Sequence, residues 1–410
     1  MKILFIQKRI LFPTDAGMKI RTLNVVRSLA RWHDVTYLCN VDDADGPYLD
    51  RMRSLGVRLE TVPWCETPRG GARFYGELLW NLLSPYPYNV AKDYDPRLRR
   101  RAAELLAGDS YDLVVCDFVQ MARNVNGLAM PASVLFQHNV EAEIFRRMAL
   151  VGSLPRRVYL GHQHRKMQRF EADAGRRFDR VVAVSDRDRS AFEREYGWSH
   201  VRTIDTAVAT DHFHPIAAPE VPGRLVFVGS LDWLPNEEGL RWFVERVWPR
   251  IRSERPDATF QIVGRNPPAS LARAAETSGV ELIGTVPDVR PYLADSQVVV
   301  VPLLTGGGTR LKIYEAMAMK KANVSTTLGA EGLPLTPDEH LLIADDAETF
   351  AAAVLGLLND ARKREAVSEA AFDLVTRSYT AEAVARQFEA ICLEAAGSTA
   401  RDETVRTCTP

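Results

Sequence analysis

The chain has 410 residues, a length that predicts two or three domains. Hydrophobic residues make up 46% of the sequence and charged residues 26%, so ordinary hydrophobic cores can form. The formal net charge of -1 gives no whole-protein argument for nucleic-acid binding, and no nucleic-acid partner is expected.

The cysteines argue against a disulfide framework or a zinc site. There are five of them, scattered along the chain and never spaced as Cys-x-x-Cys, and this usage fits a reducing cytoplasm. The N-terminal apolar run is broken by Gln7, Lys8 and Arg9, too early for the core of a signal peptide. No stretch approaches the roughly 18–20 apolar residues that span a bilayer, so any membrane contact is expected to be peripheral.

The first half of the chain alternates short apolar runs with segments of helical spacing. Residues 2–7 predict a strand, and residues 19–32 predict a helix with Leu23, Val26 and Leu29 on one stripe. Further strands are expected at 34–40, 58–64, 111–117, 133–139 and 179–185, and helices at 97–107 and 162–177. Continuous Val, Ile and Leu strands separated by helices indicate a parallel sheet covered on both faces.

A Pro- and Ala-rich stretch at 212–224 has the composition of a linker, and the alternation then restarts. The expected strands are 224–230, 258–264, 280–285, 296–302 and 322–327, and the expected helices are 236–254, 268–277, 288–295, 310–320 and 379–395. We therefore predict an α/β chain of two Rossmann-like, doubly wound domains that face each other across a cleft, where strand ends bind ligands.

The segment at 302–333 is the most informative. An expected strand ends at Pro302, and a helix is expected to open after a glycine loop. The loop contains Gly306, Gly307, Gly308 and Thr309. Glycines let a backbone approach a ligand, and a helix N-terminus offers unpaired N–H groups.

Charged residues beside this loop define its expected chemistry. Arg310 and Lys312 add cations, which makes the loop an anion site suited to a diphosphate. Glu315, one turn further, can accept hydrogen bonds from vicinal ribose hydroxyls. The alternative is a plain strand–turn–helix whose glycines only permit the turn, with Glu315 as a solvated helix residue.

This segment closely resembles the donor-site motif of family 4 retaining glycosyltransferases with the GT-B fold. The family carries Glu-x7-Glu here; Glu315 matches the second Glu, whereas Gly307 stands at the first. The resemblance implies that Glu315 binds the donor ribose. Backbone groups around Gly307, Gly308 and Thr309 are expected to replace the missing carboxylate in recognising the sugar.

Other segments extend the resemblance along most of the chain. Residues 13–30 look like the family's N-terminal glycine loop, and residues 203–215 look like its interdomain segment. Residues 224–243 resemble the opening of its nucleotide domain, but Ser230 and Asn236 stand where many members carry a diphosphate-binding Arg and Lys. Phosphate neutralisation is therefore expected to shift to Arg310 and Lys312.

Two strand ends in the first half supply further candidates. His138 follows the strand at 133–136, and in the family a His after this strand contacts the transferred sugar, which implies orientation and charge stabilisation. In the alternative interpretation, His138 lies in a loop and its ring forms a hydrogen bond with a nearby carbonyl. Glu141 and Asp117 are candidates for the acceptor side, although acids that begin a helix are also common dipole partners.

Three groups of site residues are thus predicted. The catalytic candidates are His138, Gly307 and Arg310. The donor-binding candidates are Gly17, Gly229, Ser230, Arg265, Val286, Gly306, Gly308, Thr309, Leu311, Lys312 and Glu315, with main-chain groups around Val286 expected to bind the nucleobase. The acceptor candidates are Glu141 and Asp117, and no metal ligands are predicted.

The resemblance also implies domain roles. An acceptor-binding domain is expected at 1–210 and a nucleotide-sugar-binding domain at 211–378. A C-terminal helix at 379–396 is expected to pack back on the N-terminal domain, and residues 397–410 are expected to form a disordered tail.

The implied reaction is a retaining, metal-independent transfer from a nucleotide-sugar to a sugar, lipid-linked or small-molecule acceptor, with no further cofactor. Such a reaction belongs to polysaccharide, glycolipid or glycoconjugate synthesis. Basic runs at 97–101 and 156–177 are either solvated helix faces or contacts with anionic lipid. A cytoplasmic location is expected, and the lipid interpretation would add the inner face of the membrane. A non-hydrolysing nucleotide-sugar 2-epimerase and a non-catalytic sugar-nucleotide-binding scaffold remain as alternatives.

Overall fold

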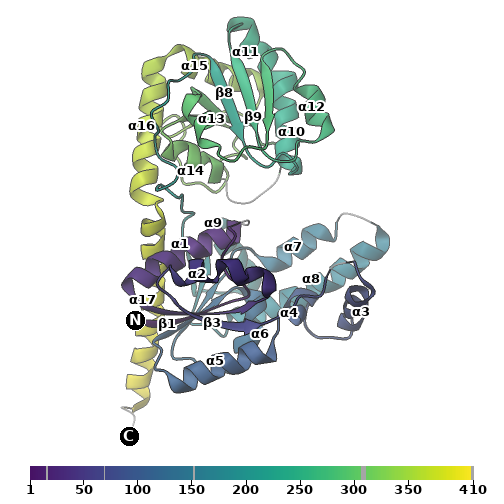
Figure 1. The fold of residues 1–410 in the computed structure, drawn as a ribbon, viewed down its shortest axis with the longest axis vertical. Coiled ribbons are helices and arrows are strands. Elements are labelled where there is room, and N and C mark those ends of the chain that lie inside the picture. The colour runs from purple at the N-terminus through teal and green to yellow at the C-terminus, as the bar shows by residue number, and fades with distance from the viewer. Residues whose placement is uncertain (15–16, 69, 151–152, 306–310, 408–410) are drawn as a thin grey trace. The chain divides into compact units, whose positions relative to one another are not determined.

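The chain folds into two compact units, shown in Figure 1. The computed structural model describes residues 1–14, 17–68, 70–150, 153–305 and 311–407, with side chains through residue 397. Unit 1 comprises Met1–Asp205 and the chain from Val384 onward, and unit 2 comprises Thr206–Ala383. Each unit is built on a parallel sheet with helices, which confirms the α/β class predicted from the sequence.

Unit 1 contains a seven-stranded parallel sheet in the order β3-β2-β1-β4-β5-β6-β7. Its strands are β1 (Lys2–Gln7), β2 (Asp34–Val41), β3 (Arg58–Pro63), β4 (Leu113–Asp117), β5 (Ser133–Phe136), β6 (Arg180–Ala183) and β7 (Val201–Thr203). The strand order reverses between β1 and β4, so the carboxyl ends of β1, β4 and β5 lie at the switch point where α/β sheets bind ligands.

Helices cover both faces of this sheet, with α1 and α5 on opposite sides in Figure 1. The helices of unit 1 are α1 (Gly17–Trp32), α2 (Leu49–Arg53), α3 (Ala72–Asn81), α4 (Tyr88–Lys92), α5 (Pro96–Gly108), α6 (Ala122–Val125), α7 (Glu141–Met148), α8 (Leu154–Gly175), α9 (Asp186–Tyr196) and α17 (Ala381–Thr407), with short 3₁₀ segments η1 (Asp43–Tyr48) and η2 (Val119–Met121). Helix α8 begins well before residue 162, where the sequence pattern placed its start, because Pro155 is tolerated in a first helical turn.

Unit 2 contains a six-stranded parallel sheet in the order β10-β9-β8-β11-β12-β13. Its strands are β8 (Arg224–Val228), β9 (Thr259–Val263), β10 (Val280–Gly284), β11 (Val298–Val301), β12 (Ala322–Ser325) and β13 (Leu342–Ile343). Its helices are α10 (Leu234–Trp242), α11 (Trp248–Glu254), α12 (Ala269–Ala274), α13 (Arg290–Asp295), α14 (Leu311–Ala318), α15 (Ala347–Asn359) and α16 (Ala361–Ser378).

The single helix predicted at 236–254 is interrupted. A π-helical segment, η3 (Phe243–Val247), separates α10 from α11. Pro249 in the first turn of α11 has no N–H to donate, so the regular hydrogen-bond ladder cannot run through this point. The period of the apolar residues continues across the break, which is why the sequence pattern did not reveal it.

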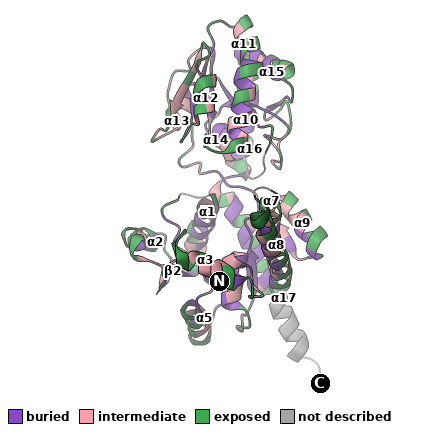
Figure 2. Ribbon diagram, turned by 90° about the vertical axis from the view of Figure 1, so that its right-hand side faces the viewer, coloured by how far each residue is buried: buried purple, intermediate pink, exposed green. Residues whose placement is uncertain are grey.

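The strands are apolar on both faces, as a covered parallel sheet requires. In β11, Val298 and Val300 belong to one core cluster of unit 2, whereas Val299 and Val301 belong to another on the opposite face. Figure 2 shows buried and exposed turns alternating along helices such as α10 and α15, whose inner faces cover these clusters. The core positions of the sheet therefore follow directly from the two-residue period of a strand.

Helix α17 packs against the rest of unit 1 through several side chains. The ring of Phe388 lies 4.9 Å from that of Phe136, measured between centroids, and Oε1 of Glu389 lies 2.7 Å from Nε2 of His33. The helix runs to Thr407 rather than ending at 396, because residues 397–407 contain no proline and Gly397 alone costs only about 1 kcal/mol. Residues 408–410 of the predicted tail lie outside the described residues.

Packing at Gly175, the last residue of α8, gives a test of the fold. A Cβ there would lie 2.1 Å from Cζ2 of Trp198, which is buried and stacked on Phe192 at a centroid distance of 5.0 Å. We expect Gly175→Ala to lower the free energy of unfolding by about 1–3 kcal/mol, because a packed ring cannot move aside cheaply. Chemical denaturation of the full chain measures this change.

Gly161→Ala in the same helix is the matched control. Its added Cβ would meet nothing within 4 Å, so we expect unchanged or slightly higher stability, since Ala favours helix over Gly. Equal effects of the two substitutions would contradict the described packing of Trp198.

Candidate functional site

Three polar side chains of unit 1 meet at the carboxyl edge of its sheet. Asp117 is the last residue of β4, and His138 follows β5 by two residues. Thr22 lies in α1, the helix that follows β1. Because β1, β4 and β5 are adjacent parallel strands, their carboxyl ends reach the same edge. Arg21 precedes Thr22 in α1 and contacts His138, and we call Arg21, Thr22, Asp117 and His138 the histidine cluster.

Hydrogen bonds from two sides fix the imidazole of His138. Its Nε2 lies 2.7 Å from Oδ1 of Asp117, and Nη1 of Arg21 lies 3.2 Å from its Nδ1. A guanidinium can only donate, so Nδ1 accepts and the ring proton is on Nε2, which donates to Asp117. Thr22 donates its hydroxyl proton to the other carboxylate oxygen of Asp117 at 2.6 Å. This arrangement holds one neutral tautomer in one orientation.

Most of the histidine cluster is buried. Thr22, Asp117 and His138 are buried, and the imidazole packs against the ring of Phe136 at a centroid distance of 4.4 Å. Burial lowers the pKa of Arg21 to about 10, opposed by the charges of Asp188 and Asp117, so the guanidinium is still charged at neutral pH. The partners of His138 are thus a carboxylate and a guanidinium, not the backbone carbonyl of the alternative interpretation.

Glu141 begins α7, as the sequence pattern predicted, but its carboxyl group is buried. Its Oε2 accepts a hydrogen bond from Nε2 of Gln120 at 2.8 Å. Burial, and then the charge of Glu171, raise the pKa of Glu141 to about 8. A carboxyl group with this pKa is largely protonated at neutral pH, so Glu141 does not act mainly as an anionic partner of the helix dipole.

The N-terminus of α7 is capped instead by Glu171, from the C-terminal part of α8. The carboxylate accepts from the backbone N–H groups of Glu141 at 3.0 Å and Ala142 at 3.1 Å. The hydroxyl of Tyr196 and Nε2 of Gln137 donate to the same carboxylate at 2.8 and 3.0 Å. Burial raises the pKa of Glu171 to about 7 against these four hydrogen bonds. Glu171 was not predicted from the sequence, because no local pattern links it to a helix start 30 residues away.

The donor-site candidates of unit 2 gather at the ends of β8 and β9. Nζ of Lys312, the second residue of α14, donates to Oδ1 of Asn236 at 2.9 Å and lies 4.1 Å from the ring centroid of Phe227. Nδ2 of Asn236 donates to the backbone oxygen of Ser230 at 2.7 Å. Nε of Arg265 donates to Oγ of Ser230 at 2.8 Å. We call Ser230, Asn236, Arg265 and Lys312 the lysine cluster; it places two cations beside the first turn of α10.

Two glycines allow this close packing. A Cβ at Gly229 would lie 2.7 Å from Nζ of Lys312, and a Cβ at Gly264 would lie 1.7 Å from the carbonyl oxygen of Gly229. The backbones that follow β8 and β9 therefore meet without side chains between them. The sequence analysis predicted Gly229 but not Gly264, whose requirement arises only from the pairing of the two strands.

Glu315 lies on α14, one turn after Leu311, the first residue of that helix. Burial raises the pKa of the Glu315 carboxyl to about 7, opposed by the charge of Lys312. Near neutral pH this group can therefore both accept and donate hydrogen bonds, which suits it to a pair of hydroxyl groups.

The remaining predicted residues are less informative. Val286 lies in the loop after β10 and packs against the core of unit 2. Gly17 begins α1, and a Cβ there would meet nothing within 4 Å, so packing does not require a glycine. Gly306, Gly307, Gly308, Thr309 and Arg310 lie outside the described residues.

Arg21 and Thr22 were also missed by the sequence analysis. The available signal was polarity: they stand next to Leu23, in a segment whose helical period brings buried residues to one face. A buried polar side chain needs a partner, so Thr22 could have been marked as a site residue. Its partner could not be named, because Asp117 is 95 residues away along the chain.

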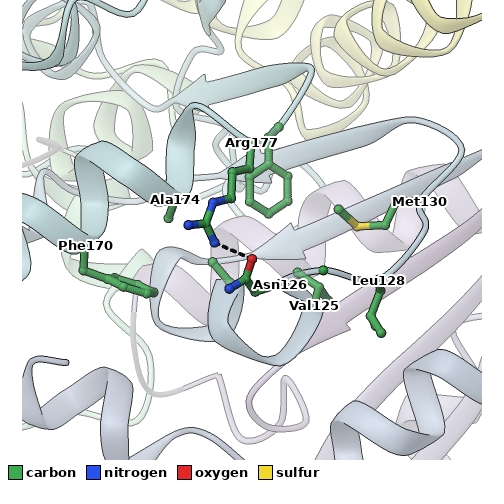
Figure 3. A pocket seen from close by; sticks show the side chains of 10 residues that line it. Val125, Asn126, Leu128, Met130, Phe170, Ala174 and Arg177 are labelled. Carbon is green, nitrogen blue, oxygen red and sulfur yellow. Dashed lines mark hydrogen bonds between the residues drawn. The ribbon is translucent and has the colours of Figure 1, made fainter. Parts of the chain in front are cut away.

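A small apolar pocket of unit 1 contains none of the predicted site residues. It has a volume of about 140 Å³ and is lined by Val125, Leu128 and Phe170, among others. Figure 3 shows Arg177 donating to Asn126 at this pocket. Because the lining is apolar and Arg177 also pairs with Asp173, the pocket lacks the convergent polar groups that a sugar nucleotide needs.

Within the described ranges, no group of three or more His, Cys, Asp and Glu side chains is placed to hold a metal ion. In the same part of the chain, no helix combines the length and apolar character needed to cross a bilayer.

Known proteins resemble the chain both in part and over nearly its full length. Residues 222–360 match the family described as glycosyl transferases group 1. An uncharacterized 44.6 kDa protein from the cps region of Klebsiella pneumoniae is 23% identical over 407 residues, covering 93% of this chain and 97% of that protein. A phosphatidyl-myo-inositol mannosyltransferase of Mycolicibacterium smegmatis is 29% identical over 197 residues, covering 44% of this chain and 50% of that enzyme.

The fold also matches solved structures. HepE of Anabaena, crystallised with UDP and glucose, is 14% identical and has a TM-score of 0.63, with 95% of this chain and 98% of that chain covered. This likeness confirms the GT-B fold expected from the sequence. The chain therefore has the two-domain architecture of GT-B glycosyltransferases, and its unit 2 contains the segment that matches glycosyl transferases group 1.

The pKa of Glu141 gives a pH-dependent prediction. It lies near 8 in the folded state, against an ordinary value of 4.5. Between these values the folded protein holds a proton that the unfolded chain releases, so this group makes stability fall as pH rises. We expect the free energy of unfolding to fall by on the order of 1 kcal/mol or more between about pH 5 and pH 8. Urea denaturation across this range measures it.

Glu141→Gln places a neutral amide where the protonated carboxyl lies, so its stability should fall less over the same pH range. Glu143→Gln is the matched control, because the pKa of Glu143 is lowered to about 2 by Arg146 and its charge does not change in this window. An identical pH slope for wild type and Glu141→Gln would show that Glu141 is ionised in the folded protein.

Proposed function

We propose that this chain is a family 4 retaining glycosyltransferase that moves a sugar from a nucleotide-sugar donor to an acceptor hydroxyl without a metal ion. The observation that carries the proposal is the lysine cluster, which lies at the strand ends of the domain that matches glycosyl transferases group 1. Two cations beside a helix N-terminus and a glycine backbone form a site suited to a diphosphate.

The proposed donor contacts follow from this cluster. Lys312 and Arg265 bind the diphosphate, and Nζ of Lys312 lies against Asn236, where resembling enzymes carry a lysine. This geometry supports the expected shift of phosphate binding to Lys312. Glu315 accepts hydrogen bonds from the ribose hydroxyls, and main-chain groups around Val286 bind the nucleobase. The proposal also assigns the glycine loop before α14 to the diphosphate and sugar, with Gly307 and Arg310 at the reacting centre.

In the proposed reaction, the bond between the anomeric carbon and the diphosphate oxygen breaks. The acceptor hydroxyl attacks the oxocarbenium-like sugar from the same face, and its proton passes to an oxygen of the leaving diphosphate. Lys312, Arg265 and Arg310 stabilise the negative charge that develops there. No protein base is required, which agrees with the engagement of both ring nitrogens of His138.

His138 is proposed to orient the transferred sugar, and Asp117 acts through it as a positioning residue. Both carboxylate oxygens of Asp117 are bonded to protein partners, and the carboxyl of Glu141 is buried against Gln120. We therefore assign Glu141 to shaping the acceptor side of unit 1 rather than to proton transfer.

The proposed acceptor is a sugar, a lipid-linked group or another small molecule, in polysaccharide, glycolipid or glycoconjugate synthesis. The relative from a cps region and the relative named for phosphatidyl-myo-inositol support saccharide and lipid-linked acceptors. A cytoplasmic location at the inner face of a membrane is part of the same proposal.

Glu315→Ala tests the donor site. Loss of the ribose contact should weaken nucleotide binding about tenfold, roughly 1.4 kcal/mol. Calorimetric titration with UDP, GDP and ADP measures it, with UDP first because HepE was crystallised with UDP. Glu276→Ala, which removes an exposed carboxylate of unit 2, is the control and should bind like wild type. If Glu315→Ala also binds every nucleotide like wild type, the assignment of Glu315 is wrong.

His138→Ala tests the orienting role. Turnover should fall on the order of 100-fold, because a misplaced sugar loses its reactive geometry, whereas the affinity for the nucleotide should stay unchanged. Nucleotide release with a panel of donors and acceptors, in buffer containing EDTA, measures turnover and tests metal independence together. His138→Gln retains a donor for Asp117 and controls for folding, with thermal unfolding recorded for both variants. Full turnover by a folded His138→Ala variant would refute the role.

A further inference from the structure

Helix α3 of unit 1 turns its apolar stripe outward. Tyr75, Leu79 and Leu83 recur every four residues, so they lie on one side of the helix and its following turn. The exposed fractions are 67% for Leu79, 76% for Trp80 and 81% for Leu83. A surface helix of a globular protein normally directs such a stripe toward the core.

The other side of α3 is fixed to unit 1 by polar contacts. Oε2 of Glu77 accepts from the hydroxyl of Tyr88 at 3.2 Å. At the C-terminus of α3, Oδ1 of Asn81 accepts from Nε2 of Gln163 at 2.9 Å, and its backbone oxygen accepts from Nζ of Lys166 at 2.6 Å. These contacts place α3 beside α8, as Figure 1 also shows, and they prevent the apolar stripe from turning inward.

Helix α8 carries a second exposed apolar group at its N-terminus. Leu154 and Val158, one turn apart, are 72% and 66% exposed. The same outward face continues along the helix to the exposed Arg165 and Arg169, while the opposite face is buried in unit 1. Apolar and basic side chains thus share one solvent-facing side of α8.

The arginines of α8 differ from the other basic run of unit 1. In the described part of the chain, Arg156, Arg157, Arg165 and Arg169 form no ion pair. By contrast, the run at 97–101 is paired with carboxylates: Arg97 with Asp95 at 3.2 Å, Arg100 with Glu104 at 3.8 Å and Arg101 with Glu60 at 2.9 Å. The run at 97–101 is therefore a solvated helix face, whereas the charges of these four arginines of α8 are not compensated by an ion pair among the described residues.

We infer that the surface formed by Leu79, Trp80, Leu83, Leu154, Val158 and the arginines of α8 docks on an anionic lipid bilayer. We call it the α3–α8 surface. Exposed Trp and Leu side chains enter the boundary between headgroups and acyl chains, and neighbouring arginines attract anionic headgroups. The inference deepens the proposed membrane location and rests on it, but it does not depend on the transfer reaction.

Cosedimentation of the full chain with lipid vesicles tests this inference. The chain should bind vesicles of phosphatidylcholine with phosphatidylglycerol and bind pure phosphatidylcholine weakly. The triple variant Leu79→Ser, Trp80→Ser, Leu83→Ser should lower the partition coefficient roughly tenfold or more. The double variant Arg157→Gln, Arg165→Gln should lower it several-fold and reduce its salt dependence, because exposed charges are screened by salt.

Two control variants match these changes outside the α3–α8 surface. Leu393→Ser removes an exposed leucine of α17, and Arg100→Gln removes an ion-paired arginine of α5; both should bind vesicles like wild type. Equal binding by the surface variants and the controls, or no binding to either kind of vesicle, overturns the inference.

Sedimentation velocity and UDP titration separate lipid docking from self-association and from donor binding. One contrary outcome is a wild-type chain that self-associates without binding either kind of vesicle, together with a triple variant that no longer self-associates. In that case a second copy of the chain covers the surface, and the inference is wrong. The surface variants should bind UDP like wild type. Loss of donor binding by the wild-type chain would count against the proposed reaction, while vesicle binding would still decide the role of the α3–α8 surface.

Discussion

Parallel pairing of adjacent strands is the constraint on which both candidate clusters depend. In unit 1, β4 and β5 pair with Asp117 opposite Phe136, so the chain reaches His138 within hydrogen-bond distance of Asp117. In unit 2, the amide of Gly229 donates to Val263 at 3.0 Å, and this contact brings the glycines after β8 and β9 together. A shift of one residue in either register would move the side chains to the opposite face of the sheet.

Buried charge sets the second constraint on the site. A charge removed from water is tolerated only when partners compensate it. Asp117 receives donors on both oxygens, and Glu171 receives four. These bonds connect α1, α7, α8 and α9 to the carboxyl edge of one sheet. The histidine cluster is consequently preorganised, because each polar group holds the next in a single orientation.

The arginines of unit 1 show that the effect of a basic residue depends on the carboxylates that lie beside it in the fold. Both basic runs looked alike in sequence, but Arg101 of α5 lies against Glu60 of β3, so its charge is compensated within the fold. Arg165 lies on an outward face and forms no ion pair among the described residues. Whether a basic run can attract an anionic surface therefore depends on acidic residues that lie far from it in the sequence.

The sequence by itself determined the alternation of strands and helices, the two parallel sheets, the strand ends followed by His138 and Gly229, and the helix start that carries Lys312. These features follow from local periodicity and from the conformational freedom of glycine, both of which can be read within short segments. Only the tertiary structure decided the partners of His138, the cap that Glu171 gives to α7 and the outward direction of the α3 stripe. Those features depend on strand order and on contacts between residues up to 117 positions apart, which no local pattern encodes.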